Sequence, residues 1–129
     1  MMRAADRSDP RVLIVDDSAC YRQVICELLA RRGYEIAGEA ESIAAALRLA
    51  GTVQPDAALV DVRLPDGNGF ELAARLTRSY PQIAVLMTSS QFDHNFHARA
   101  GASGALGFVP KSRLAQIEFE AFWPRDGCG

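Results

Sequence analysis

Five polar residues lie where short apolar runs of the chain end, and their types suit one kind of chemistry. They are Asp16, Asp17, Asp61, Thr88 and Lys111. Three carboxylates near one point can hold Mg²⁺, and a carboxylate such as that of Asp61 can attack phosphorus to form an acyl phosphate. The oxygens of the transferred group then need the cation, an ammonium and a hydroxyl to balance them. The set therefore predicts magnesium-assisted phosphoryl transfer to Asp61, provided that the fold brings these residues together.

Each signal also has a simpler local interpretation when it is taken alone. Asp61 is followed by Pro65-Asp66-Gly67-Asn68-Gly69, a turn and helix-start signal, so it is compatible with an Asp that caps a turn. Asp16 and Asp17 are compatible with a solvated turn in which Asp17 or Ser18 caps a helix. Adjacent carboxylates, however, raise each other's cost of ionising, and a divalent cation would relieve that cost. The occurrence of polar groups at four strand ends together favours a shared site.

Lysine is rare in this chain. Of 14 basic residues, 13 are Arg and one, Lys111, is Lys. Lysine offers a compact ammonium on a flexible stem, which arginine does not reproduce. The single lysine is therefore a candidate for a specific role.

The elements that must position these residues alternate along the chain. Five apolar runs predict strands, at Arg11–Val15, Tyr34–Ala40, Ala57–Asp61, Ile83–Met87 and Ala105–Val109. The segments between and after them predict five helices, at about Tyr21–Arg32, Ser42–Gly51, Phe70–Ser79, Phe92–Ala100 and Ser112–Trp123. Such alternation implies a parallel sheet with helices on both faces. Ligands of these sheets bind outside the carboxyl ends of the strands, at the switch point of the strand order, so the five polar residues are expected to converge there.

In this order and at these spacings, the motifs resemble those of a response-regulator receiver domain from bacterial two-component signalling. Asp16-Asp17 match the acidic pair, Asp61 the phosphoacceptor, Thr88 the switch hydroxyl and Lys111 the family's lysine, and the resemblance runs from about Arg11 to Ile117. Pro110 precedes Lys111, whereas many receivers have the proline after the lysine. Phe-x-Pro-Lys-Ser resembles receivers that carry a helix-turn-helix output domain. The resemblance implies a chemotaxis-receiver-like α/β fold: a three-layer, doubly wound (βα)5 domain with a five-stranded parallel sheet in the flavodoxin-like order 2-1-3-4-5.

The resemblance also implies a metal site. Asp17 and Asp61 would bind Mg²⁺ directly, together with the backbone carbonyl of Arg63. Asp16 would bind the ion through water. Mg²⁺ is therefore the expected cofactor.

Further roles implied by the resemblance concern the phosphoryl group and the switch. The backbone N–H groups of Val62 and Ser89 would face the phosphoryl oxygens. Thr88 would be the switch hydroxyl, and Phe108 lies where receivers carry a switch aromatic. Phosphorylation would change the face formed by the fourth helix, the fifth strand and the last helix.

The implied function is that of a phosphoacceptor in a two-component system or phosphorelay. The partners would be a sensor histidine kinase or a histidine phosphotransferase, and then a downstream effector protein or a second copy of the chain. The protein would be no enzyme beyond its self-catalysed phosphorylation and dephosphorylation of the aspartate. The alternative is a degenerate receiver that binds a protein partner independently of phosphorylation.

We expect one receiver domain over 11–123, with a flexible N-terminal tail over 1–10 and a C-terminal tail over 124–129. No output domain follows in the sequence, so a stand-alone receiver or one that lost its effector is expected. Phe119, Phe122 and Trp123 crowd the end of the last helix. This cluster is compatible equally with closure of the core and with an apolar partner surface.

Composition excludes several other classes. The net charge of −2 provides no basic field for nucleic acid, and no apolar run approaches the length of a membrane span. The polar segment 1–10 does not fit a signal peptide. Three cysteines, an odd number without a CxxC pair, favour reduced thiols and hence the cytoplasm.

Two other families with related chemistry or topology fit the motifs less well. An aspartyl-nucleophile phosphatase needs a second Asp two residues after its nucleophile, and position 63 is Arg. A flavodoxin needs a hydroxyl-rich phosphate loop after its first strand, where Asp16 and Asp17 would instead repel a phosphate. His94 and His97 lie one helical turn apart, but without a nearby third ligand they are interpreted as exposed side chains on a mobile helix.

Overall fold

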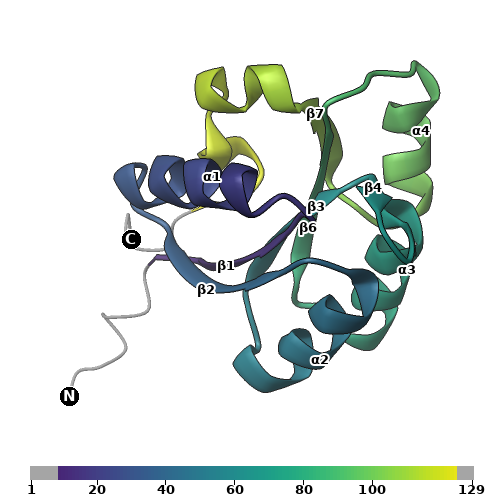
Figure 1. Ribbon diagram of the computed structural model, residues 1–129, viewed down its shortest axis with the longest axis horizontal. Helices are drawn as coiled ribbons and strands as arrows, with labels where there is room; N and C mark the ends of the chain where they lie inside the picture. The colour runs from purple at the N-terminus through teal and green to yellow at the C-terminus, as the bar shows by residue number, and fades with distance from the viewer. Residues whose placement is uncertain (1–8, 125–129) are drawn as a thin grey trace.

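A five-stranded parallel sheet forms the centre of the molecule, as the computed structural model of residues 9–124 shows (Figure 1). The strand order is β2-β1-β3-β6-β7. The strands are β1 (Arg11–Val15), β2 (Glu35–Ala40), β3 (Ala57–Asp61), β6 (Ala84–Ser89) and β7 (Gly107–Pro110). This order is equivalent to 2-1-3-4-5, so the predicted fold class is confirmed. Residues 1–8 and 125–129, which include most of both expected tails and Cys128, lie outside the described residues.

Helices cover both faces of the sheet (Figure 1). The sheet therefore separates the core into two layers, one on each face. The helices are α1 (Ala19–Arg31), α2 (Ile43–Val53), α3 (Gly69–Ser79) and α4 (Asn95–Ala102). Along β1, Val12 and Ile14 pack toward α1, whereas Leu13 and Val15 pack toward α2 and α3. Both faces of the central strands are therefore buried, which explains their continuous apolar runs.

The register of the sheet places the polar residues at one edge. β1 pairs with both β2 and β3, so the strand order switches beside β1. Asp61, the last residue of β3, is opposite Thr88 in β6. Ser89 is in turn opposite Pro110 in β7, so Lys111 begins at the same edge. The predicted convergence at the carboxyl ends of the strands is confirmed.

Short polar residues fix where the helices begin. The hydroxyl of Ser18 accepts a hydrogen bond from the Tyr21 N–H, and that of Ser42 accepts one from the Ala45 N–H. Asn68 caps α3 in the same way. Gly33 follows α1 with φ of 91°, a left-handed conformation that suits glycine.

Several predicted boundaries were wrong by a few residues. α2 continues past Gly51 to Val53 and ends at Gln54, which adopts φ of 49°. α4 begins at Asn95 instead of Phe92, and β6 extends to Ser89. A two-stranded antiparallel ribbon, β4 (Arg63–Leu64) and β5 (Gly67–Asn68), was not predicted.

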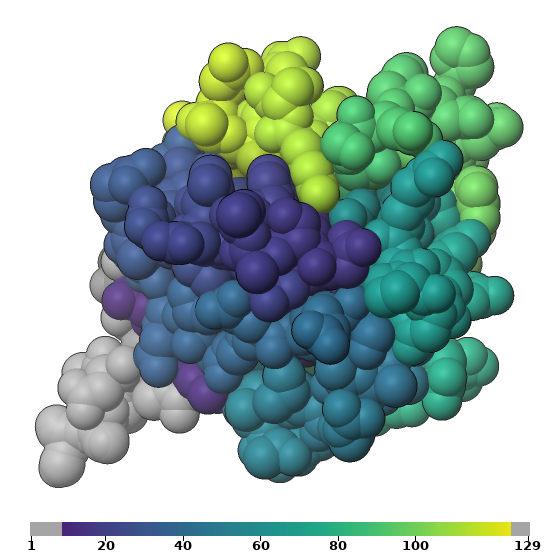
Figure 2. Space-filling model, viewed as in Figure 1, coloured from purple at the N-terminus to yellow at the C-terminus, as the bar shows by residue number. Residues whose placement is uncertain are grey.

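The last predicted helix, Ser112–Trp123, is not α-helical. Two 3₁₀ segments replace it, η2 (Lys111–Gln116) and η3 (Phe119–Ala121), separated by extended backbone at Ile117. The guanidinium of Arg32 donates to the carbonyls of Ala115 and Ile117, at 2.5 and 2.8 Å. Those carbonyls would otherwise accept the i+4 bonds of an α-helix. The segment therefore packs against α1 without regular α-helical structure, held by the Arg32 side chain (Figure 2).

The aromatic cluster of this segment closes the core. Phe119 and Trp123 are almost fully buried and stack with ring centroids 5.5 Å apart. The Trp123 indole N–H donates to the Ala84 carbonyl, and the Tyr34 hydroxyl donates to the Trp123 carbonyl. Of the two interpretations left open by the sequence, core closure is correct for these two residues.

Among residues 9–124, no helix combines the length and apolar character that crossing a bilayer requires.

Candidate functional site

Asp61 lies at the carboxyl end of β3 and is almost fully buried, with 5% of its surface exposed. The chain after it folds back tightly, because the Gly69 N–H donates to the Val62 carbonyl at 2.7 Å. A Cβ atom at Gly69 would lie 2.0 Å from the Asp61 carbonyl oxygen. Only glycine therefore allows α3 to begin this close to Asp61. Gly69 was not predicted as a site residue, although the Asn68-Gly69 turn signal could have indicated it.

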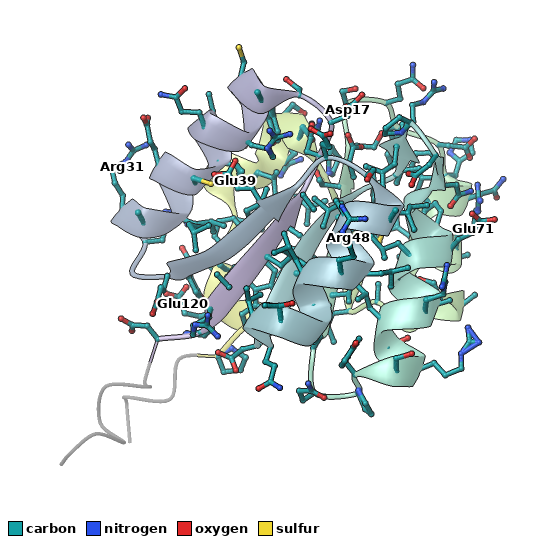
Figure 3. The ribbon with its side chains drawn as sticks, turned by 60° about the horizontal axis from the view of Figure 1, so that its bottom comes forward. Asp17, Arg31, Glu39, Arg48, Glu71 and Glu120 are labelled. Atoms are coloured by element: carbon teal, nitrogen blue, oxygen red, sulfur yellow. The ribbon has the colours of Figure 1, made fainter. Side chains whose placement is uncertain are left out.

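Three carboxylates converge at this edge. Carboxylate oxygens of Asp16, Asp17 and Asp61 all lie within 4.8 Å of one another. Asp16 is buried and its Oδ1 accepts a hydrogen bond from the Ser18 N–H, whereas Asp17 is exposed where α1 begins (Figure 3). Within residues 9–124 this is the single group of three or more such side chains close enough to share a metal ion.

The donor set fits Mg²⁺. The ion prefers oxygen ligands, and one or two carboxylates plus water commonly hold it. The Asp16 Oδ2 atom is buried without a regular hydrogen bond and is balanced here by an ion pair with the Lys111 ammonium. Asp17 is open to solvent and Asp61 is buried, so one side of the triad remains accessible to water.

The Lys111 ammonium links two of the three carboxylates. Its Nζ atom lies 2.6 Å from Asp16 Oδ2 and 3.2 Å from Asp61 Oδ2. Burial alone would lower the pKa of Lys111, but the close contact with Asp16 and the charges of Asp61 and Asp16 outweigh it and raise that pKa. The lysine therefore stays charged. The single lysine of the chain, a candidate for a specific role because of its rarity, thus lies beside Asp61.

Asp61 is an ionisable carboxyl in a poorly solvated place. Burial raises its pKa to about 6, the Lys111 charge works in the opposite direction, and the Asp16 charge raises it further. At neutral pH the carboxylate is largely ionised but costly to keep charged. A cation or a covalent modification at Asp61 would relieve that cost.

An open pocket of about 360 Å³ gives access to Asp61. Its walls include Arg63, Pro65 and Ser90 as well as the acidic residues and Lys111. The Arg63 N–H donates to Asp61 Oδ1 at 3.3 Å, and the Arg63 side chain is exposed. The volume suits a small anionic group with its water.

The predicted phosphoryl-binding groups are present, but two of them are engaged elsewhere in this structure. The Thr88 hydroxyl donates to the Val109 carbonyl at 2.7 Å, away from Asp61. The Val62 N–H donates to the Thr88 carbonyl at 2.8 Å. Ser89 is buried at the end of β6, where its hydroxyl accepts from the Gln91 N–H. Phosphoryl binding as predicted requires Thr88 to rotate and the Val62 bond to lengthen or be shared.

Phe108 is buried on β7 and packs against aromatic residues of α4 and of the segment that precedes α4. Its ring centroid lies 5.2 Å from that of Phe96, 5.6 Å from that of His97 and 6.1 Å from that of Phe92. His94 and His97 both contact the exposed Phe92 ring. The two histidines thus belong to an aromatic cluster beside Phe108.

Two residues near the site were missed as functional candidates. The Tyr21 ring, named from the sequence only as the start of a predicted helix, lies with its centroid 4.1 Å from the Lys111 Nζ atom. The Arg22 guanidinium donates to the Asp16 carbonyl at 2.6 Å and to the Glu39 carboxylate at 3.0 Å. These bonds hold the backbone at Asp16 against β2. Neither contact has a signal in the sequence: Tyr21 and Lys111 lie 90 residues apart along the chain, and the direction of the Arg22 side chain is a rotamer choice.

Comparisons with known proteins agree with this geometry. The family model of the response regulator receiver domain matches residues 12–118. The DNA-binding transcriptional activator DevR/DosR of Mycobacterium tuberculosis is 37% identical over 102 residues, which are 78% of this chain and 47% of that protein. The chemotaxis protein CheY of Thermotoga maritima is 30% identical over 101 residues, 78% of this chain and 84% of that protein. The chain therefore spans about half the length of several curated relatives.

A solved structure shows the same fold. A two-component response regulator of the LuxR family from Aurantimonas sp. SI85-9A1 superposes with a TM-score of 0.81 at 27% identity, covering 92% of this chain and 88% of that one. The sheet order, with acidic residues and a lysine at its carboxyl edge, defines a two-component signal receiver. The chain belongs to the response regulator receiver domain family.

Proposed function

We propose that this domain accepts a phosphoryl group on Asp61 from a sensor histidine kinase or a histidine phosphotransferase. One observation carries the proposal: the buried Asp61 carboxylate opens into a pocket with two further carboxylates, and the Lys111 ammonium already contacts it. An ordinary turn-capping Asp needs neither the other acids nor the lysine. The proposed receiver domain covers 11–123.

In the proposed reaction, an ionised oxygen of Asp61 attacks the phosphorus of a phosphohistidine. The P–O bond forms as the P–N bond breaks, and the imidazole leaves with the electron pair and takes up a proton. Lys111 can move from the Asp61 oxygen to a phosphoryl oxygen, because its stem is flexible and its charge is retained. The protein would act only on itself and would not turn over a separate substrate.

Asp16, Asp17 and Asp61, with the Arg63 carbonyl, would hold Mg²⁺. When bound, the ion supplies positive charge that balances the phosphoryl oxygens. The residues of this chain orient the group: Lys111 pairs with one oxygen, and the Thr88 hydroxyl, after rotation, donates to another.

The proposed output is a change in the face formed by α4, β7 and η2. Rotation of Thr88 toward the phosphoryl group breaks its bond to the Val109 carbonyl and leaves space that the neighbouring Phe108 ring can enter. α4 can follow, because it is a short helix of eight residues. This is a two-state element biased by a local change of charge. In this proposal the 3₁₀ segment η2 takes the place of the last helix in the expected face.

A downstream effector protein or a second copy of the chain would read this face. We propose no direct contact with nucleic acid by this domain, because its net charge is −2. Partners of this kind act in the cytoplasm, and we propose that location.

Intact-mass measurement with Mg²⁺ and acetyl phosphate or phosphoramidate tests the proposal. The wild-type chain should gain one phosphoryl group, and chelation of Mg²⁺ should prevent the gain. Asp61→Asn should abolish it, whereas Asp56→Asn, at the opposite edge of the sheet, should leave it intact. An unlabelled wild-type chain would instead favour a degenerate receiver that binds its partner without phosphorylation.

A further inference from the structure

The Lys111 ammonium has a third neighbour besides its two carboxylates. The Tyr21 ring lies with its centroid 4.1 Å from the Nζ atom, well inside the range of a cation–π contact. An ammonium has three N–H groups, and two of its contacts here are Asp16 and Asp61. The ring face is therefore a third partner of the ammonium, beside the two carboxylates.

Local hydrogen bonds fix the backbone at Tyr21, from which the ring projects. The Tyr21 N–H donates to the Ser18 hydroxyl at 3.1 Å, and the Ser18 N–H donates to Asp16 Oδ1 at 2.9 Å. Asp16, Ser18 and Tyr21 are thus linked by hydrogen bonds, and Lys111 contacts both ends of this linked set: it forms an ion pair with Asp16 and a cation–π contact with Tyr21. In Figure 2 the start of α1 and the segment that follows β7 meet at the surface. The ring is half-buried in this junction and is not part of the pocket wall.

We propose that Tyr21 is a positioning residue for phosphoryl transfer: its ring face holds the Lys111 ammonium beside Asp61. The inference rests on the proposed function and adds a residue that acts through Lys111, without contact with the phosphoryl group. A lysine stem is flexible and its ammonium is strongly hydrated. The ring replaces part of that hydration, so the charge remains at the site.

The same contact fits both states of the reaction. In the resting protein the ammonium is shared between Asp16, Asp61 and the ring. When a phosphoryl oxygen takes the place of the Asp61 oxygen, the ring contact remains available. Tyr21 would therefore limit the movement of Lys111 to a short step between two oxygens. Without the ring, the ammonium is free to move out into water.

The contact can be tested directly by NMR, because the chain has a single lysine. Lysine labelled with ¹³C at the ε-carbon gives the signal of Lys111 alone. The ring current should shift its ε-protons upfield in the wild type and in Tyr21→Phe, and Tyr21→Leu should remove the shift. The shift should persist after addition of Mg²⁺ and beryllofluoride. A wild-type signal at the position of an unshifted lysine, in either state, would overturn the inference.

The functional consequence is measured as the rate of phosphorylation by phosphoramidate. Tyr21→Leu should slow it about 10-fold, which corresponds to losing a partly desolvated cation–π contact, and Tyr21→Phe should retain a rate within about 2-fold. Val24→Ala, on the exposed face of the same helix, serves as the control and should behave like the wild type. Mg²⁺ affinity should not fall in Tyr21→Leu, whereas general damage to the start of α1 would weaken it.

The outcomes separate this inference from the proposed function. If the wild type takes up no phosphoryl group, the proposed function fails and the lysine signal alone decides the Tyr21 contact. If the wild type is labelled and Tyr21→Leu is labelled equally fast, Tyr21 has no positioning role. A Tyr21→Phe variant as slow as Tyr21→Leu would also refute the inference, because the ring face would then be insufficient.

Discussion

Replacement of Asp61 by Asn should stabilise the Mg²⁺-free protein at neutral pH. Burial raises the pKa of Asp61 from 3.8 to about 6, so the folded state is penalised whenever this carboxyl ionises. A shift of about two units corresponds to about 3 kcal/mol, and the open pocket screens part of it, so we expect about 2 kcal/mol. Asparagine keeps the shape and removes the charge.

The sign of the pH dependence follows from linkage. A raised pKa means that the folded state binds the proton more tightly than the unfolded state. The favourable contribution is fully present below the unfolded pKa of 3.8 and is lost as pH rises through about 6. The advantage of Asp61→Asn over the wild type should therefore grow between about pH 4 and about pH 7 and then level off.

Urea unfolding at a series of pH values in EDTA measures this difference. Any effect of the substitution that does not depend on pH cancels when the stability difference is compared between pH values. Asp66→Asn is a control of opposite sign, because the N–H groups of Ile43 and Ala44 donate to Asp66 and lower its pKa. That variant should be less stable than the wild type at neutral pH, with the difference shrinking as pH falls. Mg²⁺ should narrow the gap between Asp61→Asn and the wild type. A gap that does not change with pH would refute the reasoning.

Three further perturbations test the site. Lys111→Arg should still bind Mg²⁺ but should not transmit beryllofluoride binding to the NMR signals of α4, since Arg differs in reach and shape; a wild-type response would show that the lysine is not required. Arg63→Ala should shorten the half-life of the aspartyl phosphate followed by mass, because the exposed Arg63 borders the pocket and can hinder the hydrolytic water; an unchanged or longer half-life would contradict this. Thr88→Ala should confine beryllofluoride-induced shifts to the site, whereas in the wild type they should reach Phe108. Wild-type shifts that stop at the ligand would rule out the proposed coupling.

The positions of the polar residues were predictable because they depend on strand ends. Apolar runs in the sequence define where strands stop, and a parallel sheet collects those ends at one edge. Asp61 and Lys111 therefore came together as expected. The caps at Ser18 and Ser42 were also predictable, since capping is a local hydrogen bond within one turn.

Side-chain direction and the C-terminal segment were not predictable in the same way. The Thr88 hydroxyl points to the Val109 carbonyl, a choice between rotamers that the sequence does not encode locally. The 3₁₀ geometry after Lys111 depends on Arg32, which lies more than 80 residues away along the chain. Tyr21 was recognisable only as a residue of a predicted helix, and its second role depends on the approach of Lys111 from another element.

The anchoring of Trp123 has a practical consequence for attaching probes. Its indole contacts the start of β6 and its carbonyl contacts Tyr34 just before β2, so residue 123 lies at the amino edge of the sheet. Residue 10 precedes β1 at the same edge. A five-residue strand separates this edge from Asp61 by about 16 Å. A fluorophore or a surface tether joined at residue 10 or at the exposed Pro124 would leave the pocket mouth open to a phosphodonor, so immobilised protein should be labelled as readily as free protein.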